Sequence, residues 1–240
     1  MHHLSYFILL ALLAEILGTI GGFGSSLFFV PIASYFLDFQ SVLGITAVFH
    51  VSSNISKIAL FRKGIDKHLM IYLGIPAVIS VIIGAIISKY VNVKMLEIVL
   101  ALFLSVLSIL LLVFRNFQLK PSRFNSVSGG LLSGFIAGLI GTGGAIRGIV
   151  LSTYNLSTDV FIATSAVIDL GIDASRSVVY FLNGYVHRDD LYLLPILFVV
   201  SFVGTLIGKQ ILKKFSQAQF KTIVLLLIMI TGFVTLYKWM

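Results

Sequence analysis

Gly18-Thr19-Ile20-Gly21-Gly22-Phe23-Gly24-Ser25-Ser26 and Gly138-Leu139-Ile140-Gly141-Thr142-Gly143-Gly144 each interrupt an apolar run, at residues 4–37 and 126–153. Several glycines close together break a helix, because each loses backbone entropy without gaining side-chain packing. In a membrane, backbone without partners is tolerated only inside the protein or beside a wet cavity. We therefore expect two broken helices that face a cavity. The alternative is close helix packing through small residues.

The composition of the chain is that of an integral membrane protein. Hydrophobic residues make up 58% of its 240 residues and charged residues 11%, against about 25% charged in an ordinary globular domain. The net charge of +8 does not indicate nucleic-acid binding, because the basic residues separate apolar runs, as in membrane loops. Cysteine is absent, which excludes disulfide scaffolds and thiolate metal sites.

Six further apolar runs each have the length of one membrane-spanning helix, for which about 20 apolar residues are needed. These runs cover residues 41–61, 69–88, 95–114, 159–182, 191–212 and 219–237. They lack the alternating pattern of outer-membrane barrel strands. The sequence therefore predicts an all-α membrane protein.

Landmarks of the first half recur 120 residues later, as in Gly18 and Gly138 or Gly84 and Gly204, which indicates an internal duplication. We predict two repeats, residues 1–120 and 121–240. Each would have one re-entrant, glycine-broken helix pair and three transmembrane helices. If the repeats are inverted, most basic loop residues fall on one side, which the positive-inside rule assigns to the cytoplasm. If each broken run crosses the membrane once, the two sides of the membrane carry similar numbers of basic residues. The positive-inside rule therefore favours the inverted arrangement.

Two polar stripes lie within the predicted membrane segments, where ionisable groups are by default functional hypotheses. His50, Asn54 and Lys57 share one helix face at i, i+4 and i+7. Asp169, Asp173 and Arg176 repeat this spacing 119 residues later. In inverted repeats the two stripes would face each other across the midplane.

These features predict a binding site for an anion. Helix starts at the glycine breaks present unpaired backbone N–H groups and a partial positive charge, as in many inverted-repeat transporters. Arg147, one turn past the second break, favours a planar or oxyanion group. The predicted substrate-binding residues are Gly24, Ser25, Ser26, His50, Asn54, Lys57, Gly143, Gly144, Arg147 and Arg176.

Asp169 and Asp173 are predicted to couple transport to an ion. Like charges on one face do not both ionise in a low dielectric without a cation. Asp169 is then the proton carrier, unless Arg147 reaches it. The alternative is a structural network in which Asp173 pairs with Arg176 and Asp169 with Arg147. Lys57 would in that case extend to the membrane surface, and Glu15 is a further candidate that the sequence does not rank.

Together these motifs resemble the sulfite exporter TauE/SafE family. The resemblance covers essentially the whole chain in two copies and rests on Gly21-Gly22-Phe23-Gly24 running to Val30-Pro31, Gly141-Thr142-Gly143-Gly144, Gly44-Ile45-Thr46, Ala163-Thr164-Ser165, Arg62-Lys63-Gly64-Ile65-Asp66 and Asn183-Gly184-Tyr185-Val186. Leu151 stands where Pro31 would map in the second copy. The family implies a multi-pass permease of the cytoplasmic membrane for a small sulfur-containing anion, such as sulfite or an organosulfonate.

Three functions stay open at this stage. A secondary transporter is favoured, since the chain has no phosphate-binding G-x-x-x-x-G-K-[ST] motif. An anion channel would use the glycine breaks as a backbone-lined filter. An intramembrane enzyme would use Ser25 with His50, without a G-x-S-x-G motif. We expect no catalytic residue, no cofactor, no metal and no nucleic acid. The expected partners are the anion and the lipid bilayer, with a homodimer as an open alternative.

Overall fold

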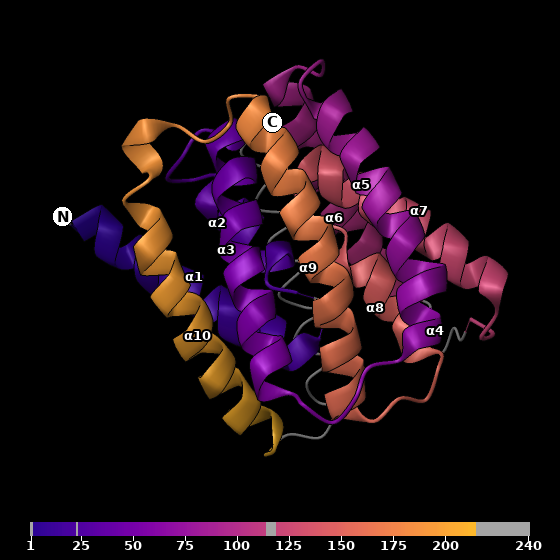
Figure 1. Ribbon diagram of the computed structural model, residues 1–240. Coiled ribbons are helices and arrows are strands. Elements are labelled where there is room, and N and C mark those ends of the chain that lie inside the picture. Colours follow the sequence, from indigo (N-terminus) through magenta and orange to yellow (C-terminus); the bar gives the residue numbers. More distant parts are fainter. Residues whose placement is uncertain (1, 23, 114–118, 215–240) are drawn as a thin grey trace.

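The computed structural model describes residues 2–22, 24–113 and 119–214, and every element in these ranges is helical (Figure 1). This confirms the all-α prediction for the described part of the chain. The elements are α1 (His2–Gly21), α2 (Ser26–Ala33), α3 (Phe39–Leu60), α4 (Lys67–Leu69), the π-helix η1 (Met70–Gly74), α5 (Ile75–Ser88), α6 (Val93–Val113), α7 (Arg123–Ile140), α8 (Gly144–Ser152), α9 (Thr158–Leu182), the 3-10 helix η2 (Arg188–Asp190) and α10 (Leu193–Leu212). The predicted span at 219–237 lies outside the described residues.

Five described segments are long and apolar enough to cross a membrane. They are Leu4–Gly21, Phe39–Leu60, Lys67–Ser88, Val93–Leu110 and Leu193–Leu212. The third joins α4, η1 and α5 into one continuous helical segment. α9 is also long, at 25 residues, but Asp169, Asp173 and Arg176 lie in it. The run at 159–182 therefore forms the expected helix, but a more charged one than the other spans.

Both glycine clusters end one helix and start another. α1 ends at Gly21 and α2 begins at Ser26, with Gly22 at φ 66° and Gly24 at φ 84°. α7 ends at Ile140, and Gly141 follows at φ 81°. L-residues with a Cβ rarely adopt this left-handed backbone, so glycine allows the chain to turn at these positions.

Each break produces a helical hairpin with unequal arms. Phe7, near the start of α1, packs on Phe29 and Phe36 with ring centroids 5.8 and 5.4 Å apart, so the chain returns along α1. Tyr154, just after α8, donates a 3.1 Å hydrogen bond to the carbonyl of Ser122 at the start of α7. α1 and α7 have 20 and 18 residues, while α2 and α8 have 8 and 9. In each pair the first arm is much longer than the second, because its helix continues through the apolar run as far as the glycine cluster.

α3 and α9 lie side by side in the middle of the molecule and run antiparallel (Figure 1). The backbone N–H of Asp66, after the end of α3, donates a 3.0 Å hydrogen bond to Thr164 near the start of α9. At the other end, Asp38 precedes α3 and lies 3.6 Å from His187, which follows α9. α1 packs along α10, and α5 packs along α7. Each hairpin therefore lies against a helix of the other half of the chain.

Glycine also permits the close approach of α7 to α5. A Cβ on Gly134 would lie 2.1 Å from the carbonyl oxygen of Ala77, and one on Gly138 would lie 2.1 Å from that of Val81. Real Cβ atoms do not come this near to another heavy atom. Close packing therefore explains Gly138, whereas the turn explains Gly141, so the second cluster combines both roles that the sequence suggested.

Candidate functional site

A cavity lies where the two helix breaks meet α3 and α9. Its volume is about 20 Å³, room for a water-sized group, so a large organic ligand would not fit. Every residue that we predicted to bind substrate or couple an ion lines it: Gly24, Ser25, Ser26, His50, Asn54, Lys57, Gly143, Gly144, Arg147, Asp169, Asp173 and Arg176. The structure thus brings the whole set together, and the roles of its members stay predictions.

Three ion pairs surround the cavity. Lys57 Nζ lies 3.0 Å from Glu15 Oε1, Arg147 Nη2 lies 2.5 Å from Asp169 Oδ1, and Arg176 Nη2 lies 2.7 Å from Asp173 Oδ1. The two arginine pairs are those of the structural alternative considered from the sequence. With each cation matched by one carboxylate, the three pairs together carry no net charge.

Arg147 reaches Asp169 from the start of α8. Its Nη2 also donates to Asp169 Oδ2 at 2.6 Å, so the guanidinium contacts both carboxylate oxygens. The Nε group donates a longer bond, 3.4 Å, to the hydroxyl of Ser165. The sequence makes Asp169 the proton carrier unless Arg147 reaches it, and in the structure Arg147 does reach it.

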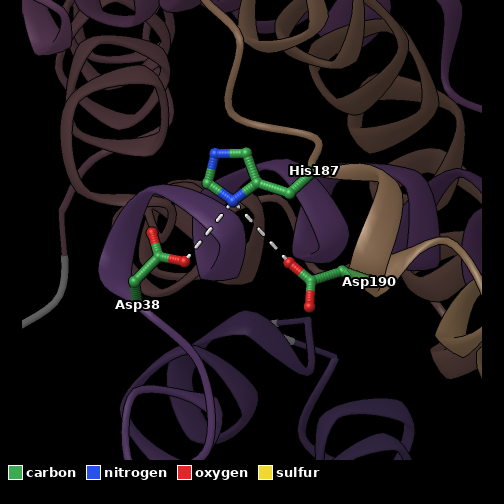
Figure 2. A group of neighbouring side chains, drawn as sticks. All are labelled: Asp38, His187 and Asp190. Carbon is green, nitrogen blue, oxygen red and sulfur yellow. Dashed lines mark ion pairs between the residues drawn. The ribbon is translucent and has the colours of Figure 1, made fainter.

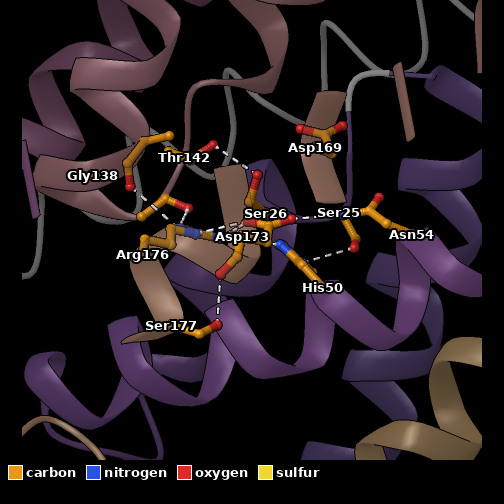
Figure 3. Close-up of polar contacts among 12 residues, drawn as sticks. Ser25, Ser26, His50, Asn54, Gly138, Thr142, Asp169, Asp173, Arg176 and Ser177 are labelled. Atoms are coloured by element: carbon orange, nitrogen blue, oxygen red, sulfur yellow. Dashed lines mark hydrogen bonds and ion pairs between the residues drawn. The ribbon is translucent and has the colours of Figure 1, made fainter. Parts of the chain in front are cut away.

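Arg176 connects α9 to the end of α7 (Figure 3). Its Nε donates to Asp173 Oδ1 at 2.7 Å, and its Nη1 donates to the carbonyls of Ala137 and Gly141 at 3.2 and 2.8 Å. The last carbonyls of a helix have no partner within the helix and favour a nearby cation. Arg176 therefore stabilises the second helix break as well as the cavity.

The two polar stripes, on α3 and α9, contact each other. Asn54 Nδ2 donates a 2.7 Å hydrogen bond to Asp173 Oδ2, the residue that occupies the corresponding place in the second half. Arg176 Nη2 lies 3.3 Å from His50 Nδ1. The helix breaks also meet, because Thr142 donates to the hydroxyl of Ser26 at 3.2 Å.

Glu15 is the functional candidate that the sequence did not rank. Its side chain is fully buried, and Lys57, at 6% exposed, turns inward to it rather than to the membrane surface. Glu15 also accepts hydrogen bonds from four hydroxyls, those of Thr19, Ser25, Ser53 and Thr205, at 3.2, 2.6, 2.6 and 3.1 Å. An acidic residue inside an apolar run was the available signal, but its partners Ser53, Lys57 and Thr205 lie far from it in the sequence.

Ser25 and His50 lie within hydrogen-bond distance, although nothing in their spacing predicts it. Ser25 Oγ is 3.0 Å from His50 Nε2. Arginine has only donors, so the neighbouring His50 Nδ1 must accept from Arg176. The neutral imidazole then carries its proton on Nε2 and donates to Ser25. A serine hydrolase needs the opposite direction, in which Nε2 accepts the serine proton.

A second polar cluster, Asp38, His187 and Asp190, joins the loop before α3 to the loop after α9 (Figure 2). Its ligand atoms all lie within 4.8 Å of one another, so these side chains could hold a metal ion. The groups also have protein partners: the Ser41 hydroxyl donates to Asp190 at 2.6 Å and contacts His187 Nδ1 at 2.8 Å. We assign the cluster a structural role, the joining of the two loops.

Asp38 caps α3 within this cluster. Its Oδ1 accepts hydrogen bonds from the backbone N–H groups of Gln40 and Ser41 at 3.1 and 3.0 Å. Partial burial acts to raise the pKa of Asp38, but the hydrogen bonds from Ser41, the charge of His187 and the bond from Gln40 together hold this pKa below its ordinary value. The carboxylate is therefore stabilised in its ionised form.

Comparison with known proteins identifies one family. The family model described as "Sulfite exporter TauE/SafE" matches residues 7–235. No match was found among curated proteins or among solved structures.

Proposed function

Since the chain belongs to the sulfite exporter TauE/SafE family, we propose that it is an ion-coupled secondary transporter of a small sulfur-containing anion, of the sulfite or organosulfonate class, in the cytoplasmic membrane. The observation that carries this proposal is the cavity at the two helix breaks, lined by Arg147 and Arg176. The guanidinium of Arg147 lies near the start of α8, where backbone N–H groups lack partners within the helix, and that of Arg176 lies at the end of α7, beside the same break.

The anion binds by competing with the carboxylates for the arginines. A sulfonate or sulfite group presents three oxygens, which suit the forked donors of a guanidinium. Ser25 and Ser26 at the start of α2, with Gly143 and Gly144 at the start of α8, supply further donors on the cavity wall. His50, Asn54 and Lys57 complete the wall from α3.

The balanced charges of the cavity support coupling to a cation. Three carboxylates match three basic groups, so an entering anion adds an uncompensated negative charge in a low-dielectric site. If the anion draws Arg147 or Arg176 away, Asp169 or Asp173 loses its partner and binds a proton. Anion binding and proton binding then favour each other by linkage.

Asp169→Asn tests this coupling. We expect the wild-type protein to bind sulfite more tightly as pH falls, and we expect the variant to show a flatter dependence, because its amide binds no proton. Affinity measured across pH in both proteins decides the matter. Identical profiles would remove Asp169 from the coupling mechanism.

The antiparallel contact of α3 with α9 and the hairpins at both breaks support inverted repeats with re-entrant helix pairs. We propose that the repeats span residues 1–120 and 121–240. In this arrangement the helix breaks lie near the membrane centre. Transporters that work by alternating access have their substrate site at this depth.

A channel is the second candidate, because the helix breaks could form a backbone-lined filter. Two features favour the transporter. Arg176 and Tyr180 of α9 donate hydrogen bonds to the carbonyls of Ala137, Gly138 and Gly141, so the backbone at the second break is held by side chains instead of lining an open anion pore. The three ion pairs also place charged groups at the cavity, and these groups form a binding site for an anion rather than an open path for it.

Flux of labelled sulfite into proteoliposomes tests the function, with methanesulfonate and chloride as alternative anions and with pH and sodium gradients set independently. We expect saturable sulfite flux that depends on one of the two gradients. Flux that follows only the membrane voltage would instead establish a channel. Absence of flux for both sulfur anions, in protein that is folded and inserted, would overturn the proposed substrate class.

A further inference from the structure

We propose that Glu15 is a second proton-binding site, which takes up a proton from the anion cavity through His50 and Ser25 when the anion binds. The inference rests on the proposed anion transport and adds to it a proton path into the first helical hairpin. His50 and Ser25, which relay the proton between the charged residues Arg176 and Glu15, carry no formal charge themselves, so the relay leaves no new buried charge between its two ends.

The path is continuous in the structure. Arg176 Nη2 lies 3.3 Å from His50 Nδ1, His50 Nε2 lies 3.0 Å from Ser25 Oγ, and Ser25 Oγ lies 2.6 Å from Glu15 Oε2 (Figure 3 shows the first two contacts). Since arginine only donates, all three hydrogen bonds point the same way, from Arg176 toward Glu15. This is the order in which protons move along a hydrogen-bonded chain.

Arg176 closes the path when the site holds no anion, because its guanidinium occupies the lone pair of His50 Nδ1. An anion that attracts Arg176 exposes this nitrogen to the cavity. A hydronium ion or a protonated oxyanion then transfers a proton to Nδ1, leaving water or the deprotonated oxyanion, His50 transfers its Nε2 proton to Ser25 Oγ, and Ser25 transfers its hydroxyl proton to Glu15 Oε2. Three bonds to hydrogen form and three break. His50 ends in its other neutral tautomer, Ser25 is restored, and Glu15 becomes neutral.

The surroundings of Glu15 show what its neutralisation does. From α3, Lys57 faces it at 3.0 Å, and His50 reaches it only through Ser25. α2 contains no ionisable residue, and the one charged residue of α10, Lys209, donates to the carbonyl of Leu60. Among the described residues, Lys57 is therefore the charged group that forms an ion pair with Glu15. Once Glu15 is neutral, the charge of Lys57 is unmatched at the cavity wall, where it attracts the anion.

The first test counts protons taken up per sulfite bound, from binding enthalpies in two buffers of different ionisation enthalpy. Glu15→Gln keeps the shape and hydrogen-bonding capacity of the side chain but binds no proton. We expect this variant to take up fewer protons than the wild type, by up to about one per sulfite. The titration of sulfite itself cancels in this difference, because both proteins are compared at the same pH.

The second test measures the rate of sulfite-driven proton uptake into proteoliposomes. Ser25→Ala removes the hydroxyl that links His50 to Glu15, and we expect proton uptake to slow by about tenfold or more. Thr205→Val is the matched control, since Thr205 also donates to Glu15 Oε1 but lies on α10, outside the path. The control should keep the wild-type rate.

The outcomes separate this inference from the proposed function. If wild-type protein binds no sulfite, the proposed function fails. If sulfite binds normally and Glu15→Gln takes up as many protons as the wild type, only the role of Glu15 is overturned. If Glu15→Gln does not fold, the comparison of Ser25→Ala with Thr205→Val decides: slower uptake in the first alone supports the path, and equal rates reject it.

Discussion

Each charged residue of the cavity has an oppositely charged neighbour, so a substitution acts through the partner that it leaves behind. Arg147 and Arg176 are almost fully buried and each contacts one aspartate. Removing one member of a buried pair costs about 3–5 kcal/mol, because the other charge stays in a low dielectric. A loss of transport in a single variant therefore does not distinguish binding from folding. Paired substitutions make that distinction.

Arg147→Ala alone should reduce the yield of folded protein, because Asp169 is left without its cation. The double variant Arg147→Ala/Asp169→Ala removes both charges, and we expect it to regain most of the thermal stability. Sulfite affinity of the double variant should remain at least about tenfold weaker, since a lost charge-assisted contact is worth about 1.5–3 kcal/mol. Thermal unfolding and sulfite titration of both variants provide the measurement. Wild-type affinity in the double variant would make Arg147 a structural residue only.

At the scale of the elements, the helix breaks and caps set where the helices end. Gly141 and Gly184 both have φ 81°, after α7 and after α9. A Cβ on Gly141 would lie 2.7 Å from Leu43 Cδ2, whereas a Cβ on Gly184 would meet nothing within 4 Å. The two positions therefore share a backbone conformation and differ in their packing.

Gly184→Ala should cost only the backbone strain, about 1–2 kcal/mol. Gly141→Ala should cost more and should also weaken sulfite binding, because a displaced break moves the carbonyl that Arg176 holds. Thermal unfolding and sulfite titration compare the two variants. Equal losses of stability with unchanged binding would contradict a role for the second break in the site.

Asp38→Ala should remove the cap of α3 and destabilise the protein by about 1 kcal/mol near neutral pH. The pKa of Asp38 is lowered in the folded protein, so its stabilisation is present above the pKa of the unfolded chain and disappears as pH falls through the folded pKa. The difference in unfolding temperature between wild type and variant should therefore vanish in acid. Asp189→Ala, at an exposed carboxylate of the nearby turn, is the control. A difference that persists in acid would show that the charge of Asp38 is not what stabilises the cap.

At the scale of the whole molecule, the two halves depend on each other. α1 packs along α10 and α5 along α7, while α3 and α9 share the central contact. Each hairpin thus has its helix partner in the other half. The site is divided in the same way, with Ser25 and His50 from the first half and Arg147 and Arg176 from the second.

Producing the two halves as separate polypeptides tests whether they depend on each other. Fragments 1–118 and 119–240 should give stable protein only when they are produced together, because each alone leaves the packing face of its hairpin uncovered. Co-purification through a tag on one fragment, followed by sulfite titration, is the measurement. Two fragments that are each monodisperse and thermally stable alone would show that the halves are independent domains.

The sequence alone determined the helical class, the position of the two breaks and the membership of the cavity. Glycine clusters break helices through local backbone energetics, and the i, i+4, i+7 spacing places His50, Asn54 and Lys57 on one face whatever the surroundings. The repeated spacing also predicted that the stripes of the two halves face each other, and Asn54 donates a 2.7 Å hydrogen bond to Asp173.

Only the tertiary structure decided the partners within the cavity. Glu15 accepts hydrogen bonds from Ser53 of α3 and Thr205 of α10 as well as from nearby Thr19 and Ser25, and no local pattern relates residue 15 to positions 53 and 205. The same packing brings Ser25 to His50 and orients that contact through Arg176. Hydrogen-bond direction depends on every neighbour at once, and those neighbours are fixed only when α1 packs on α10 and α3 on α9.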